Sequence, residues 1–126
     1  SASELISAES APQLSILKAM SPTVVSENGQ LTYTLTIQNS GNIAVIAADD
    51  VIVADKFDPI LNSISVTFNG TAWTEGVNYT YDNATGQFTT IAGQITVPAA
   101  SFVRDTATGE WTVTPGVSTI VITGTI

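Results

Sequence analysis

The segment from Leu31 to Gln38, with the sequence LTYTLTIQ, alternates strictly between large apolar and polar side chains. Leu31, Tyr33, Leu35 and Ile37 share one parity, whereas the threonines and Gln38 share the other. Successive side chains of a β-strand point to opposite faces of its sheet. The stretch therefore predicts a strand with one buried face and one hydrated face.

Further short strands are expected along the chain because β-branched residues dominate it and helix formers at helical spacing are scarce. Turn sequences rich in Gly, Asn and Pro separate these strands at regular intervals. The predicted inward-facing sets are Val51 and Val53; Ile64, Val66 and Phe68; Val77, Tyr79 and Tyr81; Phe102 with Arg104; Trp111 with Val113; and Ile120 with Ile122. This pattern predicts an all-β fold, an antiparallel β-sandwich with hairpin insertions.

The chain of 126 residues has the size of one domain with one core. Residues 1–12 are small, polar and acidic, and we expect a linker or a disordered N-terminal segment there. Within it, Leu5 and Ile6 are able either to start a short helical turn or to pair with a sheet edge. Residues 13–126 are predicted to form a single β-sandwich domain. Because VITGTI, at the end of the sequence, has the pattern of a strand, we expect one module of a longer protein.

The charge balance excludes several classes of partner. Lys18, Lys56 and Arg104 are the only basic residues beside eleven acidic ones, and the formal net charge is −8. Nucleic acid and anionic lipid surfaces would be repelled by such a chain. No apolar run approaches the roughly 20 residues of a membrane-spanning helix. We therefore expect no nucleic-acid partner and no membrane insertion by this domain.

The chain contains neither histidine nor cysteine, so the preferred ligands of zinc and the usual nucleophile–base pairs are absent. Asp49 and Asp50, together with Asp55 and Asp58, supply carboxylates that calcium accepts. However, neighbours on one strand face opposite sides, so Asp49 and Asp50 do not reach one ion unless the strand bulges. We expect no metal site, no cofactor and no enzymatic activity.

A short sequence occurs twice, as YDNATGQF at residues 81–88 and as RDTATGEW at residues 104–111. Both copies contain an Asp, then Ala-Thr-Gly, one polar residue and a large aromatic. An Asp side chain caps the backbone amides that follow it, and a glycine adopts the left-handed conformation of a tight hairpin. Each copy is therefore interpreted as a hairpin turn whose aromatic enters the core. The turn residues are Asp82 and Gly86 in the first copy and Asp105 and Gly109 in the second, and the aromatics are Phe88 and Trp111.

A metal loop or a glycan site fits the repeated sequence less well than a hairpin turn does. Calcium loops place oxygen ligands at alternate positions, but Ala84 and Ala107 stand where the second oxygen is needed. Asn83 begins a glycosylation acceptor pattern, but Thr106 occupies the matching position of the second copy. Neither a metal nor a glycan accounts for both copies.

Residues 31–61, LTYTLTIQNSGNIAVIAADDVIVADKFDPIL, resemble the conserved repeat domain of bacterial cell-surface proteins known as domain of unknown function eleven. Including the entry ILKAMSP, the resemblance covers about residues 14–68, and one departure is an insertion at Lys56-Phe57-Asp58. The matching positions are Lys18, Pro22, Tyr33, Asn39, Gly41, Asn42, Asp55 and Pro59. The resemblance implies an immunoglobulin-like module, often repeated in tandem in secreted, wall-attached proteins, without catalysis.

Lys18 shares parity with Leu14, Ile16 and Met20 and is therefore expected to point inward. A buried, unpaired ammonium costs several kcal/mol. Similarity to stalk modules of Gram-positive adhesins implies one solution, condensation of the lysine with an Asn or Asp side chain. The candidate partners are Asp55, Asp50 and Asn39, although the last strand, which usually supplies the acceptor, contains neither residue type. The alternative is an ordinary ion pair with Asp55, or a lysine that reaches the rim.

Exposed aromatics are able to form a stacking platform for sugars. Trp73, Tyr79, Tyr81 and Trp111 are the candidates. Tyr79 and Tyr81 share parity with Val77, which favours the core, whereas Trp73 lies in the loop-like stretch GTAWTEG. Large aromatics mostly serve burial, so a role as core or loop anchors is favoured, with Trp73 the candidate ligand contact.

Two functions follow from these patterns. The first is a structural stalk or spacer module of a secreted surface protein, located extracellularly at the cell surface or wall of a Gram-positive bacterium. The alternative is an adhesin-type binding module that recognises a glycan or a host protein through end loops around Trp73. We expect a monomer whose main partners are neighbouring domains of the same chain.

Overall fold

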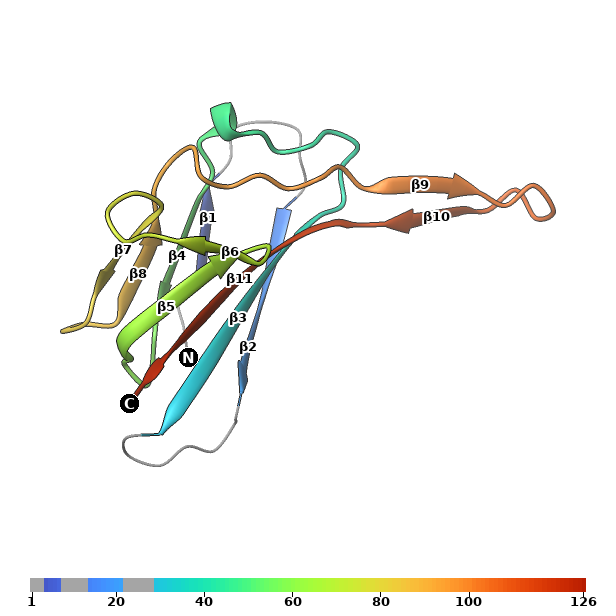
Figure 1. Cartoon of the computed structure of the whole chain (residues 1–126). Coiled ribbons are helices and arrows are strands. Elements are labelled where there is room, and N and C mark those ends of the chain that lie inside the picture. The colour runs from blue at the N-terminus through green and yellow to red at the C-terminus, as the bar shows by residue number, and fades with distance from the viewer. Residues whose placement is uncertain (1–3, 8–13, 22–28) are drawn as a thin grey trace.

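The computed structural model describes residues 4–7, 14–21 and 29–126, and in these the fold is all-β apart from one short 3-10 helix (Figure 1). The elements are β1 (Glu4–Ser7), β2 (Leu14–Ser21), β3 (Gln30–Asn39), η1 (Ala47–Asp49), β4 (Ile52–Lys56), β5 (Asn62–Phe68), β6 (Thr71–Trp73), β7 (Tyr79–Asp82), β8 (Gln87–Thr90), β9 (Ser101–Arg104), β10 (Trp111–Thr114) and β11 (Gly116–Thr125).

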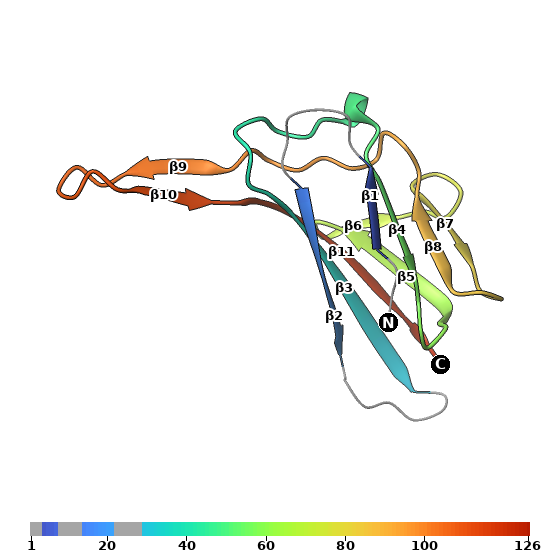
Figure 2. The same ribbon diagram turned by 180° about the vertical axis from the view of Figure 1, so that it is seen from behind.

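The strands form three open antiparallel sheets. The largest has the order β2-β3-β11-β5-β6, the second has the order β1-β4-β8-β7, and β9 and β10 pair with each other. Figures 1 and 2 show the two larger sheets as two layers, from which the β9–β10 hairpin extends to one side. The all-β class expected from the sequence is confirmed, with a sandwich-like arrangement of layers.

β3 and β11 are the longest strands and lie side by side in the middle of the large sheet. Their antiparallel register runs over ten residue pairs, from Gly116 opposite Asn39 to Thr125 opposite Gln30. Along β3 the apolar parity is buried and the threonines are only partly covered. The strand predicted at Leu31–Gln38 is therefore confirmed.

One buried cluster holds the two layers together. It draws on both large sheets and on the connections between them, and its largest members are Tyr33, Phe57 and Phe88. The ring of Phe57 stacks on that of Tyr33 with centroids 4.6 Å apart, and lies 5.6 Å from that of Phe88. Full burial stabilises by about 1.5–3 kcal/mol per large apolar side chain, so this cluster is the main source of stability.

The β9–β10 hairpin, residues 101–114, is called the arm below. Every residue in it is exposed, and Figure 1 shows it extending well beyond the two layers. The strands expected around Phe102 and Trp111 are present, but they do not face the core. The expectation that Trp111 enters the core is wrong, because its side chain is 64% exposed. Among the residues that the structure describes, no second layer covers the arm.

Two other segments differ from the sequence-based picture. Val77 precedes β7 and is exposed rather than inward-facing. Within residues 1–12, the strand β1 pairs antiparallel with β4, as the edge-pairing alternative for Leu5 and Ile6 anticipated. The rest of the predicted linker, residues 1–3 and 8–12, and the predicted domain start at residue 13 lie outside the described residues.

In the described ranges, no helix has the length and apolarity that a membrane crossing requires.

Candidate functional site

The most unusual side chain in the core is that of Asp55. It lies in β4, where the inward parity is otherwise apolar and includes Val51, Val53 and Phe57. Asp55 is 1% exposed, in a position where a carboxylate costs several kcal/mol unless it is paired. The local strand pattern therefore forces this carboxylate between the two layers.

Lys18 supplies the partner from the opposite layer. It lies in β2, where Leu14, Ile16 and Met20 share its partly buried face, as the parity predicted. The Nζ atom lies 2.8 Å from Oδ2 of Asp55, and the lysine side chain is only 14% exposed. Because β2 belongs to the five-stranded sheet and β4 to the four-stranded sheet, this ion pair joins the two layers.

Two aromatic rings enclose the ammonium group. Nζ lies 4.5 Å from the ring centroid of Tyr33 and 5.6 Å from that of Phe57. A cation over an aromatic face gains about 0.5–1 kcal/mol at exposed sites and about 2 kcal/mol when desolvated. Sequence reasoning missed these rings as part of the site, although Phe57 shares the parity of Asp55 and Tyr33 that of the buried face of β3.

Burial raises the pKa of Asp55 above its ordinary value of 3.8, while Lys18 and the Lys56 amide act in the opposite direction. The 2.8 Å separation is that of a charge-assisted contact. Even so, neither carboxylate oxygen has a hydrogen-bond partner with acceptable angles among the described residues. The carboxylate is therefore held by charge in a poorly solvated site.

Tyrosine hydroxyls order the connection from β4 to β5 beside this pair. Tyr33 donates a hydrogen bond to the Pro59 carbonyl over 3.1 Å, and burial, followed by the charges of Asp58 and Asp55, raises its pKa to about 12. The hydroxyl of Tyr81 accepts from the Leu61 amide and donates to the Leu61 carbonyl. Both hydroxyls therefore remain neutral donors at physiological pH.

The other two partners considered for Lys18, Asn39 and Asp50, lie away from it. Lys18 is opposite Leu35 in the register, whereas Asn39 is opposite Leu14, four residues further along the strand. The Asn39 amide donates to the carbonyls of Ile43 and Pro98, and its oxygen accepts from Gly41. Asp50 is exposed and follows η1 in a left-handed conformation with φ of 53°. The structure brings Asp55 to Lys18.

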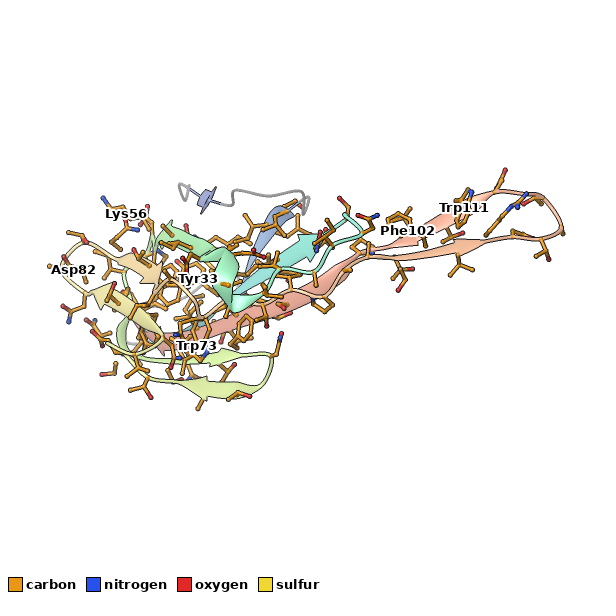
Figure 3. All side chains as sticks on the ribbon, turned by 90° about the horizontal axis from the view of Figure 1, so that it is seen from above. Tyr33, Lys56, Trp73, Asp82, Phe102 and Trp111 are labelled. Atoms are coloured by element: carbon orange, nitrogen blue, oxygen red, sulfur yellow. The ribbon has the colours of Figure 1, made fainter. Side chains whose placement is uncertain are left out.

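Trp73, the candidate ligand contact, ends β6 and is only half-exposed. Its ring stacks on that of Phe68, with centroids 4.9 Å apart and planes 10° apart. Figure 3 shows Trp73 on the body of the molecule and Trp111 on the arm. The aromatic with the more open surface is therefore Trp111, which the sequence assigned to the core.

The two repeated sequences form nearly identical hairpin turns. In the first, Asp82 Oδ1 accepts from the Ala84 amide at 2.9 Å, and in the second, Asp105 Oδ1 accepts from the Ala107 amide at 2.8 Å. Backbone hydrogen bonds of 2.7 Å also link each Asp carbonyl to the glycine that closes the turn, Gly86 or Gly109. Both glycines have positive φ, 83° and 76°. These residues shape the two turns.

The donor chemistry offers little for a metal. Among residues 4–7, 14–21 and 29–126, no three acidic side chains come together as a potential metal site. Asp49 instead accepts a hydrogen bond from the Ile46 amide at the start of η1. The Asp49 carboxylate therefore serves local backbone structure.

Comparison with protein-family models, curated proteins and solved structures finds no match. The structure shows a small all-β domain of antiparallel sheets. The resemblance to the conserved repeat domain of bacterial surface proteins remains a proposal, and the role of the site has to be argued from its geometry.

Proposed function

We propose that this domain is a structural spacer with an immunoglobulin-like β-sandwich fold, and that it serves as a stalk module of a secreted, wall-attached bacterial surface protein. The observation that carries this proposal is the Lys18–Asp55 pair between the two layers. Such a pair adds little net stability compared with apolar residues, but separating it is expensive. It therefore favours one alignment of the layers and opposes their sliding.

The strand order supports a load-bearing role. β2 and β11 lie on either side of β3, and both run antiparallel to it, so they are parallel to each other. Leu14 and Gly116, the first residues of these strands, are both opposite Asn39. Tension that pulls β2 toward its N-terminal end and β11 toward its C-terminal end therefore shears both ladders, and many backbone hydrogen bonds resist together.

Lys18 braces this arrangement because it ties β2 to β4 in the other layer. Single-molecule pulling of the domain between flexible handles tests the proposal. Lys18→Met should unfold at clearly lower force than the wild type. Leu17→Thr is the matched control, since Leu17 is the exposed neighbour on the same strand. Equal unfolding forces for Lys18→Met and the wild type would refute the bracing role.

The pair is expected to be ionic rather than covalent. Condensation would join Lys18 Nζ to the Asp55 carbonyl carbon and release one water, and it needs a neutral amine and an acid to carry the proton. The 2.8 Å separation of Lys18 Nζ and Asp55 Oδ2 is instead that of an ion pair. Intact-mass spectrometry should return the full sequence mass. A mass lower by one water would instead establish an amide cross-link, and Lys18→Met would abolish that loss.

The alternative, a module that binds a glycan or host protein through loops around Trp73, has weaker support. The stacking of Trp73 on Phe68 occupies one face of the indole that a sugar would need. Titration of glycans into the wild type and Trp73→Ala, followed by Trp fluorescence, distinguishes the two functions. Saturable binding that is lost in Trp73→Ala would favour the binding module.

A further inference from the structure

The two faces of the arm differ in composition. In its register Phe102 is opposite Val113, and Arg104 is opposite Trp111. Directly opposite residues, and residues two apart on a strand, lie on the same side of a β-ribbon. Phe102, Val113, Arg104 and Trp111 therefore share one face, called the arm face below. The other face carries Ser101, Val103, Thr112 and Thr114.

The arm face is open to solvent in the isolated chain. Phe102, Val113 and Trp111 are all exposed, by 43%, 45% and 64%. A two-stranded hairpin is only marginally stable in water without a third strand or an element packed against it. Trp and Arg are also the residue types that contribute most at the centres of protein interfaces. The composition of the arm face is therefore typical of a surface that contacts another protein.

A hollow of about 290 Å³ lies at the other end of the molecule, lined by Ser63, Ile64, Glu75, Tyr81 and Asn83. Its size suits a single large side chain, since pockets for small ligands begin near about 300 Å³. β11 connects the two places: it starts next to the arm at Gly116 and ends at Thr125, opposite Asn62. In Figure 1 the arm and the β7–β8 hairpin likewise extend in opposite directions.

The charges of the two surfaces are complementary. Arg104 is the one charged residue of the arm face, because Asp105 and Glu110 beside it have the parity of the other face. Glu75 is the one charged residue that lines the hollow. A second hollow, beside Phe57 and Ile60, contains one carboxylate, Asp58, and one ammonium, Lys56, so its net attraction for Arg104 is weaker. The chain as a whole is acidic, with a net charge of −8, so the positive charge of Arg104 favours an acidic partner such as a second copy.

We propose that the arm of one molecule docks in the Glu75 hollow of a second copy. Trp111 then packs against Ile64 and Tyr81, and the Arg104 guanidinium pairs with the Glu75 carboxylate. Because donor and acceptor lie at opposite ends of one chain, the contact is heterologous and each copy still offers one free arm and one free hollow. The product is a head-to-tail assembly in place of the monomer expected from the sequence. This inference does not depend on the spacer role.

Sedimentation velocity over a wide concentration range tests the assembly. The wild type should start from 13.1 kDa and grow past the dimer as concentration rises. Trp111→Ser should weaken association by about tenfold or more, as loss of an interface anchor does. Val103→Ser is the matched control, since Val103 is exposed on the opposite face of the same hairpin. Thermal unfolding checks that both variants keep the fold.

Mixing two defective variants tests the polarity. Trp111→Ser keeps the hollow and lacks the anchor, whereas Glu75→Arg keeps the anchor and repels Arg104. Each should be monomeric alone, and together they should form a one-to-one heterodimer that grows no further. Arg104→Glu combined with Glu75→Arg in one chain should restore growth.

Three results would overturn the proposal. The first is a wild type that stays at the monomer mass at every concentration. The second is a wild type that stops at the dimer, with variants that do not complement, which indicates symmetric arm-to-arm contact. The third is equal weakening by Val103→Ser and Trp111→Ser, which indicates contact that ignores the arm face.

Discussion

The two hairpins built on the repeated sequence have the same turn and opposite surroundings. The Asp caps, the closing hydrogen bonds and the left-handed glycines of the two turns agree closely. Tyr81 is opposite Phe88 in the first hairpin, as Arg104 is opposite Trp111 in the second. Yet Phe88 is completely buried, whereas Trp111 is 64% exposed.

The difference shows which features depend on the local sequence and which depend on packing. Each turn is formed by an Asp side chain and the backbone that directly follows it, so the same short sequence folds in the same way in both places. Burial of the next aromatic depends on what lies across the sheet. Phe88 of β8 packs on Phe57, which stacks on Tyr33 of the five-stranded layer, whereas the arm faces solvent. The repeated sequence therefore determines the hairpin turn, but it does not determine whether the aromatic residue that follows is buried.

The largest expected contrast is between the two aromatics. Phe88→Ala should lower the free energy of unfolding by about 3–5 kcal/mol, because it leaves a cavity in the core. Trp111→Ala should change it by less than about 0.5 kcal/mol, since little of its surface is covered. Urea unfolding followed by circular dichroism measures both. Similar losses would mean that the arm is part of the cooperative core.

The two cations should differ nearly as much. Lys18→Met leaves Asp55 buried without its partner and should cost about 3–5 kcal/mol. Arg104→Met removes an exposed charge from the arm and should cost less than about 0.5 kcal/mol. Equilibrium unfolding of the two variants at neutral pH decides this. Replacing Asp55 by Leu in the Lys18→Met background should recover much of the loss, and a further loss would contradict the role of the ion pair.

The turn glycines provide a contrast of intermediate size. A Cβ at Gly86 would lie 2.6 Å from the Phe57 carbonyl oxygen, so Gly86→Ala adds a clash to the strain of positive φ and should cost about 2 kcal/mol or more. At Gly109 the nearest atom is 3.8 Å away, on Arg104. Gly109→Ala should leave global stability nearly unchanged and only speed hydrogen exchange of the Asp105 amide. Equal global losses would disprove this distinction.

The smallest expected effect concerns pH. Burial raises the pKa of Asp55 in the folded state, so the folded state binds this proton more tightly than the unfolded chain. Its contribution to stability is therefore complete below the ordinary pKa near 3.8 and is lost as pH rises through the raised value. The difference in unfolding free energy between the wild type and Asp55→Asn, measured across acidic pH, should fall as pH increases. A flat difference would contradict the shift.

The alternation of apolar and polar residues along single strands was enough to predict the all-β class and the position of Lys18, one of the two partners of the ion pair. The parity of β3 predicted its buried face, and the parity of β2 predicted that Lys18 points inward. Which carboxylate meets Lys18 depends on the pairing of distant strands, so three candidates remained open. The exposure of Trp111 was not predictable either, because an apolar strand face has the same sequence pattern whether a layer of its own chain covers it or not.

Gly116 has a practical consequence. A side chain at Gly116 would collide with the backbone of Pro98, so the connection that leads into β9 and the start of β11 after β10 are held together at one point. Everything beyond that point is an insertion whose ends are already brought together. We therefore expect residues 101–114 to tolerate replacement by a foreign peptide or a reporter tag without loss of the fold.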